Sequence, residues 1–308
     1  MRIIDNSALE VMASPVKCVF PKVHLALVNI APEREAQLDE LYPEFTLEYL
    51  DSHNWILGVT DDKRIQISSF VLEFLWATAY AHFVFYTKIF QGKQFSARTE
   101  VSLRDDPDVV AAMNLLQWAI QKLMNKDKSA WPDDLPKPQM IVGDTSDCGV
   151  ADEFTLGAVA CLLHHELAHI GLKHSGGSTI EIEKDADQES WEWIINNRRD
   201  FESSDLQKRF LLLVHAYSVG IIRDVHLGKT TMSTHPRSID RLFKLMTHFG
   251  VPENHISQAY AFATIYLHLE NSSNPLPIQG EAYDSFFSSF DEVIEHISKF
   301  PLLSKISD

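Results

Sequence analysis

The chain has few cysteines and a deficit of basic residues. Only three cysteines occur among 308 residues, Cys18, Cys148 and Cys161, and their spacings suggest no pairing. This excludes a disulfide framework and favours a reducing compartment, so we expect a cytoplasmic protein. Lys and Arg number 27 against 43 Asp and Glu, which gives a formal charge of −16. Such an acidic chain repels phosphate backbones and anionic headgroups, which argues against binding nucleic acid or a membrane surface through bulk charge.

Long hydrophobic runs are also lacking. The N-terminus reaches Glu10 before any apolar run long enough for a secretory signal. Residues 67–90 are apolar and aromatic, but they contain Glu73, His82 and Lys88. A membrane span needs about 20 mostly apolar residues, so we interpret this segment as a buried core helix. With only 12 Gly and 13 Pro and a hydrophobic content of 45%, the composition excludes a disordered chain.

Hydrophobic periodicity divides the chain into a β-containing N-terminal part, residues 1–68, and a helical part, residues 69–308. Strands are predicted at 24–28, 46–50, 55–59, 64–67 and, after a proline-rich loop, 139–142. The turn-prone Thr-Asp-Asp-Lys between the third and fourth indicates a small antiparallel β element near the N-terminus. No linker separates the two parts, so we expect one mainly α (α+β) domain spanning residues 1–308.

The helical part shows apolar residues at three- and four-residue spacing almost throughout. This pattern predicts helices at 69–91, 107–126, 152–174, 181–197, 204–227, 236–249, 252–270 and 280–298. The sequence Ser175-Gly176-Gly177-Ser178 ends the third of these helices and allows the chain to reverse.

Histidines mark the end of that third helix. Residues 162–174 read Leu-Leu-His-His-Glu-Leu-Ala-His-Ile-Gly-Leu-Lys-His, which contains the pattern H-E-x-x-H at His165, Glu166 and His169. Positions i and i+4 lie on one helical face, so two imidazoles can grip one metal ion while Glu166 serves as the general base. A pair of core histidines on an apolar helix is the structural alternative.

A hydrolytic zinc site needs a third protein ligand and an open position for water. Glu183 suits this role, because the Gly-Gly turn brings the first turn of the next helix to the depth of His169. Glu181 is the alternative ligand, and a solvated acidic first turn is the structural alternative. We therefore predict one Zn²⁺ per chain, held by His165, His169 and Glu183.

Neighbouring residues on these two helices have supporting roles. Asp187 follows Glu183 at i+4 on the same face, where its carboxylate can accept the outer N–H of a ligating histidine and fix the tautomer. His164 points about 100° away from His165 around the helix, so we expect it to pack elsewhere. His174 is expected to cap the helix end or to support the site from outside the ligand set.

The combined pattern resembles known metallopeptidases. H-E-x-x-H followed by Glu183-x-x-Ala186-Asp187 is similar to gluzincins of the HtpX and CAAX-prenyl-protease type, which share an E-x-x-A-D second helix. Downstream, Ser233-Thr234-His235-Pro236 with Arg241 looks like the S-x-H-P-x-x-x-x-R segment that those enzymes carry near the site. Those enzymes are embedded in membranes, and this chain departs from them because it has no convincing span.

The chain resembles the Lit phage-exclusion peptidase family more closely, in patches across nearly its whole length. The matching patches are Ile30 to Glu35, Trp131-Pro132, Pro136-Lys137-Pro138, Leu163 to Glu166, Glu183 to Asp187 and Thr234-His235-Pro236. Lit peptidases are understood as dormant cytoplasmic zinc proteases that cleave elongation factor Tu when they meet a peptide of the phage major capsid protein. The resemblance implies that role here, whereas the spacing of the residues implies only a zinc hydrolase.

Two interpretations of His235 and Arg241 are open. In the first, either residue joins Glu166 as a catalytic residue by donating a hydrogen bond to the oxyanion formed during peptide hydrolysis. In the second, Pro236 starts a helix and Arg241 pairs with a buried carboxylate such as Asp187.

Three other functions compete with a latent phage-exclusion protease. A cysteine hydrolase built on Cys148 lacks any local signature. A non-catalytic zinc-bound interaction protein is disfavoured, because structural zinc sites usually close with four ligands and favour Cys. A cytoplasmic housekeeping zinc peptidase with no phage role shares the same metal pattern and is not separated from the first by composition.

Overall fold

The structure is a computed structural model that describes residues 2–5, 12–42, 45–88, 106–126, 128–173, 179–196, 198, 200–227, 235–252, 255–258, 260, 261 and 264. The α-helices are α1 (Phe20–Asn29), α2 (Glu35–Leu41), α3 (Ser69–Tyr86), α5 (Pro107–Asn125), α6 (Asp147–Gly171), α7 (Ile180–Ile195), α8 (Ser204–His226) and α9 (Ser238–Phe249). Short 3₁₀ helices occupy Pro15–Cys18 and Pro32–Arg34. The strands are β1 (Arg2–Asp5), β2 (Phe45–Leu50), β3 (Leu57–Val59) and β4 (Arg64–Ser68). This confirms a mainly α fold with a small sheet near the N-terminus.

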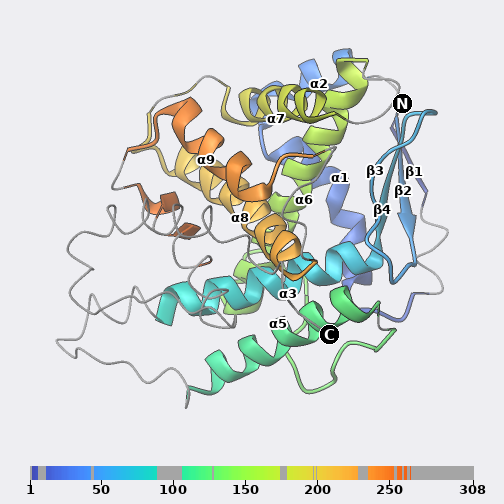
Figure 1. Cartoon of the computed structure of the whole chain (residues 1–308), viewed down its shortest axis with the longest axis vertical. Helices are drawn as coiled ribbons and strands as arrows, with labels where there is room; N and C mark the ends of the chain where they lie inside the picture. The colour runs from blue at the N-terminus through green and yellow to red at the C-terminus, as the bar shows by residue number, and fades with distance from the viewer. Residues whose placement is uncertain are drawn as a thin grey trace.

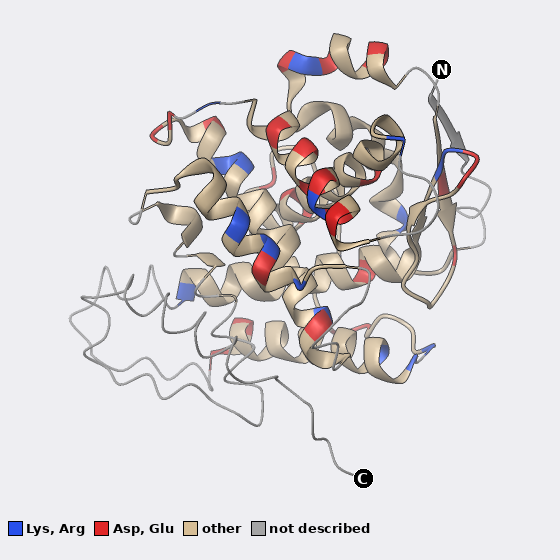
Figure 2. Ribbon diagram, turned by 45° about the horizontal axis from the view of Figure 1, so that its top comes forward, with Lys and Arg blue, Asp and Glu red and all other residues tan. Residues whose placement is uncertain are grey.

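Helix α6 lies at the centre of the helical part (Figure 1). It packs against α1, α3, α7 and α8, while α9 packs against α8. The sheet stands at one side of the helices, and β3 contacts α6. Lys and Arg are scattered among Asp and Glu along the described helices (Figure 2). The central position of α6 places the H-E-x-x-H segment between α7 on one side and β3 on the other.

Helix α3 is the buried helix predicted from residues 67–90. Nearly all its residues are out of contact with solvent, because α5, α6 and α8 cover it. Its carboxylate Glu73 is tolerated there because Lys122 of α5 donates a hydrogen bond to it at 2.6 Å. Within the described residues, no helix combines the length and the apolar character needed to cross a membrane.

The sheet has the strand order β1-β2-β4-β3, so β3 forms one edge. Strands β3 and β4 form the predicted antiparallel hairpin, in which Gly58 pairs with Gln66. The prediction of an antiparallel sheet is otherwise wrong, because β2 pairs with both β1 and β4 in parallel. The reason is the path of the chain. After β2 the chain crosses to the edge of the sheet and forms β3, and it then returns as β4, which lies between β2 and β3.

Two predicted strands are corrected by the structure. Residues 24–28 belong to helix α1, whose buried residues Phe20, Val23 and Leu27 follow a helical spacing while Leu25 stays 45% exposed. Residues 139–142 form no strand, because the chain turns there: Met140 has φ 54°, and its amide donates to Asp152 at 2.6 Å. The apolar pattern at both places is typical of a strand, but the burial of α1 follows a helical spacing and the backbone at Met140 forms a turn.

The other predicted helices match the structure to within about five residues at their ends, and the start of α6 shows one of the largest differences. Helix α6 begins at Asp147, because the Ser146 hydroxyl accepts a hydrogen bond from the Gly149 amide and caps it. Helix α9 begins at Ser238 rather than at Pro236. The helix predicted at 280–298 lies outside the described residues, as does much of 252–270, where the described residues 256–258, 260, 261 and 264 are helical.

Close packing of α6 against α8 depends on a glycine. A Cβ added to Gly157 would lie 2.4–2.7 Å from the side-chain carbons of Leu212, well inside van der Waals contact. Leu212 is itself only 6% exposed, so it has little room to move away. The absence of a side chain at Gly157 therefore sets how closely these two helices approach.

We predict that Gly157→Ala lowers the free energy of unfolding by about 1–3 kcal/mol, because the added methyl group overpacks the α6–α8 contact. In a Leu212→Ala background the clash is absent, and the same change should instead stabilise the protein by up to about 1 kcal/mol through helix propensity. Urea unfolding of the four proteins measures both effects. A loss of stability that is equal in both backgrounds would contradict the proposed contact.

Candidate active site

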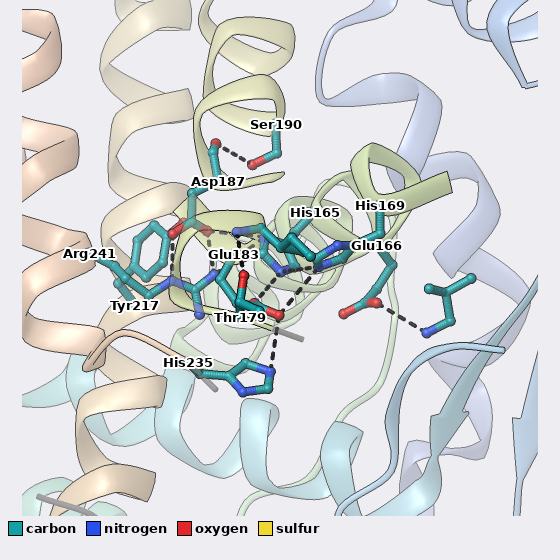
Figure 3. Close-up of polar contacts among 12 residues, drawn as sticks. His165, Glu166, His169, Thr179, Glu183, Asp187, Ser190, Tyr217, His235 and Arg241 are labelled. Atoms are coloured by element: carbon teal, nitrogen blue, oxygen red, sulfur yellow. Dashed lines mark hydrogen bonds and ion pairs between the residues drawn. The ribbon is translucent and has the colours of Figure 1, made fainter. Parts of the chain in front are cut away.

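Three potential metal ligands from α6 and α7 converge on one point (Figure 3). The Nε2 atoms of His165 and His169 lie 3.1 Å apart, and the Glu183 carboxylate is 3.2 Å from the first and 3.7 Å from the second. One ligand atom from each residue lies within 4.8 Å of the others, so the three could hold a metal ion. Within the described residues this is the only such group of three or more His, Cys, Asp or Glu side chains.

The local sequence explains why these side chains meet. His165 and His169 are one helical turn apart on α6, so both imidazoles point to the same side. Helix α7 starts after Thr179, whose hydroxyl accepts from the Ile182 amide and caps the helix. Glu183 then falls at the end of the first turn and is 2% exposed. The alternative ligand Glu181 instead points to solvent, with its side chain 77% exposed and paired with Lys184.

Asp187 orients the first histidine. Its Oδ1 lies 3.1 Å from Nδ1 of His165, so the outer ring N–H can donate to the carboxylate while Nε2 faces Glu183 and His169. Burial opposes a charge on His165, but the hydrogen bonds to Asp187 and Glu183 outweigh it and raise its pKa to about 9. The two carboxylates thus make this point in the protein favourable for a cation.

Asp187 is held in turn by residues of α8 and α9. Arg241 donates to both of its carboxylate oxygens, through Nε at 2.8 Å and through Nη2. The Tyr217 hydroxyl donates to Oδ1 at 3.0 Å and accepts from Nε1 of Trp191 at 2.6 Å. Burial alone would raise the pKa of Asp187, but the Arg241 charge and the bond from His165 hold it well below its usual range. Asp187 is therefore ionised at neutral pH.

Glu166 lies beside the three potential metal ligands but is not one of them. Its Oε2 accepts a hydrogen bond from the backbone amide of Val59, on the edge strand β3, at 3.1 Å. Burial raises the pKa of Glu166, while the neighbouring His165 opposes this shift. A carboxylate that has a raised pKa and lies close to the three potential metal ligands is suited to proton transfer.

His235 approaches the same group from the segment before α9. Its Nε2 lies 3.3 Å from Oε1 of Glu183, and its side chain is 42% exposed. Burial lowers the pKa of His235, with the Arg241 charge among the smaller causes, so the ring is neutral at neutral pH. The His235 ring thus places an N–H or a lone pair beside Glu183, on the side of the metal-ligand residues that faces the cavity.

The three potential metal ligands line a cavity of about 840 Å³. Its walls include β3 and the following turn, the end of α6, the first turn of α7 and one side of α8. His165, Glu166, His169, Glu183, His235 and Arg241 all line it. A cavity of this size beside an edge strand can accommodate an extended peptide segment.

The structure thus brings together every predicted site residue. His164 packs elsewhere, as expected: its Nε2 bonds to the Leu27 carbonyl at 2.9 Å and its ring stacks on Trp193. His174 lies outside the described residues. Sequence reasoning missed Tyr217, Trp191 and the Val59 amide. Tyr217 and Trp191 lie on helices whose spacing predicts burial only, and a backbone amide leaves no signal in a sequence.

We predict that Asp187→Asn lowers the free energy of unfolding of the chelator-treated protein by about 3 kcal/mol, because it leaves the buried Arg241 charge without its partner. The double variant Asp187→Asn, Arg241→Gln removes both charges and should recover most of that loss. Urea unfolding in the presence of a chelator separates the contribution of the Asp187–Arg241 ion pair to stability from any effect on metal affinity. Equal loss in the single and double variants would show that the ion pair is not the source of the stability.

Comparison with known proteins agrees with this geometry. The Peptidase U49 family matches residues 65–263, a range that contains all the residues of the site except Val59. "Cell death peptidase" of Escherichia coli (strain K12) is 26% identical over 285 residues, which cover 89% of this chain and 95% of that protein. No solved structure matches the chain. These findings confirm the resemblance to the Lit peptidases and indicate that the chain is a peptidase. The chain belongs to the Peptidase U49 family.

Proposed function

We propose that the chain is a zinc-dependent endopeptidase. The observation that carries the proposal is the convergence of His165, His169 and Glu183 on one point beside the Glu166 carboxylate, at the wall of an open cavity. Two imidazoles and one carboxylate, with access left on one side, are typical of catalytic zinc sites rather than structural ones. The Asp187 carboxylate behind His165 adds the orienting group that such sites usually have.

His165, His169 and Glu183 fit this metal through their chemistry as well as their position. Their ligand atoms are two ring nitrogens and a carboxylate oxygen that lie within 4.8 Å of one another, and the surrounding carboxylates favour positive charge. Zinc bound there would polarise the scissile carbonyl and lower the pKa of the attacking water toward about 7. We propose one Zn²⁺ per chain.

We predict about one zinc per purified chain by elemental analysis. Glu183→Gln should lose most of it, since the substitution weakens a ligand, whereas the matched change Glu181→Gln two residues earlier should retain it. The His165→Ala, His169→Ala double variant should bind none. Stoichiometric zinc in that double variant would rule out the assigned ligands.

Glu166 is proposed as the general base of peptide hydrolysis. It takes a proton from the attacking water and later passes it to the leaving amine. Its burial and its bond to the Val59 amide hold the carboxylate in one position at the edge of the cavity. A base that is already oriented loses little entropy when the substrate arrives.

His235 and Arg241 are given different roles. We propose that His235 donates a hydrogen bond to the developing oxyanion, because it is the more accessible of the two and lies beside Glu183. Arg241 uses Nε and Nη2 to bind Asp187, which is the pairing that the second interpretation of the sequence predicts. We therefore propose that Arg241 positions Asp187, and through it His165, and does not act on the substrate.

We predict that Glu166→Gln retains zinc and the unfolding midpoint but loses at least about 100-fold in peptidase activity, because it deletes a base without deleting a ligand. Glu153→Gln, the same change on an exposed position of α6, serves as the matched control and should be fully active. Zinc content, thermal unfolding and cleavage rate are measured on all three proteins. Near wild-type cleavage by Glu166→Gln would overturn the mechanism.

For the biological role, we propose a latent cytoplasmic protease of phage exclusion that cleaves elongation factor Tu when a phage capsid peptide is present. Membership of the family and the name of the E. coli relative, cell death peptidase, support a toxic and therefore restrained activity. Restraint can come from remote binding energy, since misplacing a substrate by about 1 Å can reduce the rate a hundredfold. Only a target held at several points would then be cleaved.

We predict that the purified zinc enzyme barely cleaves casein, yet cleaves elongation factor Tu once a peptide of the phage major capsid protein is added. Gel analysis of enzyme, target and peptide, alone and in each combination, tests this. The Glu166→Gln protein in the complete mixture controls for other proteases. Rapid unassisted cleavage of casein would favour a housekeeping peptidase, and an intact target in the complete mixture would remove the proposed substrate.

A further inference from the structure

Among the described residues, three arginines of α8 and α9 are buried or half-buried, and one of them lacks a carboxylate partner. Arg209 pairs with Glu33 and Asp205, and Arg241 pairs with Asp187. Arg223 forms no ion pair with any described residue, and its Nε is out of contact with solvent and has no hydrogen-bond acceptor. Burying part of a guanidinium without a partner is costly, so the position of Arg223 calls for an explanation.

Arg223 is held in place by an aromatic side chain. Its Cζ lies 4.8 Å from the centre of the Trp55 ring, and Trp55 in turn packs edge-on against Phe70 and Phe74 of α3. The guanidinium is therefore supported on one face by a ring that is anchored in the core. Both Arg223 and Trp55 line the same cavity as the metal-ligand group.

The position of Arg223 along α8 relates it to the site. It lies six residues after Tyr217, which corresponds to about 9 Å along the helix axis. Tyr217 binds Asp187 behind His165. An extended peptide advances about 3.3 Å per residue, so Arg223 is at the distance of a group two to three residues from the scissile bond.

Asp224, the neighbouring acid, is occupied elsewhere. Its Oδ2 accepts a hydrogen bond from the Ser238 amide at the start of α9, at 2.8 Å. Burial lowers the pKa of Arg223, and the charge of Asp224 offsets this only in part. The guanidinium N–H groups are left to bind an anion that enters the cavity.

We propose that Arg223, supported by Trp55, is a specificity-determining residue that binds a carboxylate of the peptide substrate two to three residues from the scissile bond. The carboxylate belongs either to an Asp or Glu side chain or to the free C-terminus of the substrate. This inference rests on the proposed peptidase function and goes beyond it by naming a chemical preference. Arg209 and Arg241 are less suited to this purpose, because Arg209 does not line the cavity and both guanidinium groups already pair with carboxylates of this chain.

The first experiment measures binding and does not need activity. The ¹⁵N–¹H signal of the Trp55 indole, assigned with Trp55→Phe, lies beside Arg223 and is present in every Arg223 variant. It is followed while four probes are added to the zinc-loaded protein and to its Arg223→Gln variant. These are N-acetylglutamate methylamide, its glutamine analogue, N-acetylalanine and N-acetylalanine amide. We expect the binding of a carboxylate probe to exceed that of its neutral analogue about tenfold or more, and the difference to vanish in Arg223→Gln. Equal binding of charged and neutral probes would overturn the proposal.

The second experiment tests specificity on a peptide library made from a proteome with chymotrypsin, which leaves acidic and basic residues inside the peptides. Because latency predicts slow cleavage of such peptides, the zinc-loaded enzyme is used at high concentration, in a long incubation, with the capsid peptide present. Cleavage sites found by mass spectrometry should show Asp or Glu at one constant position, or cleavage at a constant distance from the C-terminus. Arg223→Glu should replace that preference with Lys or Arg, while Lys173→Gln, a change at an exposed cation of the same cavity, should leave it unchanged. A preference that survives Arg223→Glu would contradict the proposal.

Thermal unfolding separates this role from a structural one. Removing an unpaired, half-buried charge should leave the midpoint of Arg223→Gln unchanged or raised, whereas a structural role predicts a lower midpoint. Carboxylate binding without any cleavage would argue against the peptidase mechanism and leave the Arg223 site intact. Cleavage without a charge preference would leave zinc and Glu166 in place and remove the Arg223 site.

Discussion

The Asp187 carboxylate is the point at which four helices of this protein are joined. It belongs to α7, faces His165 of α6, and accepts hydrogen bonds from Tyr217 of α8 and Arg241 of α9. The interaction is worth its desolvation cost only because every partner is present, since a buried carboxylate with one missing donor is strongly unfavourable. The geometry of the metal-ligand group is therefore a property of the helix packing and not only of the residues in the H-E-x-x-H pattern.

The site was predictable from the sequence to the extent that it is built from local helical geometry. His165 and His169 are separated by one turn, and Glu183 and Asp187 by one turn of the next helix, so spacing alone puts each pair on one face. The pairing of Arg241 with Asp187 was one of two interpretations, because a distance of 54 residues along the chain gives no geometric information. Tyr217 and Trp191 were missed for the same reason.

The fold was predictable where burial and periodicity agree. Helix α3 is apolar on all sides and is buried on all sides, so its pattern has one interpretation. Residues 24–28 were misread as a strand because a short apolar run fits either period, and only the wider spacing of Phe20, Val23 and Leu27 shows the helix. The parallel pairing of β2 with β4 depends on where the chain crosses the sheet, which no local pattern records.

The bond between the Val59 amide and Glu166 gives the proposed base two independent supports. One is the backbone of α6, which also carries His165 and His169, and the other is the outer edge of the β3–β4 hairpin. A small rigid-body tilt of that hairpin would turn the Glu166 carboxylate without moving the three potential metal ligands on α6 and α7. The exposed turn at Asp61–Lys63 follows β3 directly and lines the same cavity, so a molecule that displaces this turn would also move the Glu166 carboxylate.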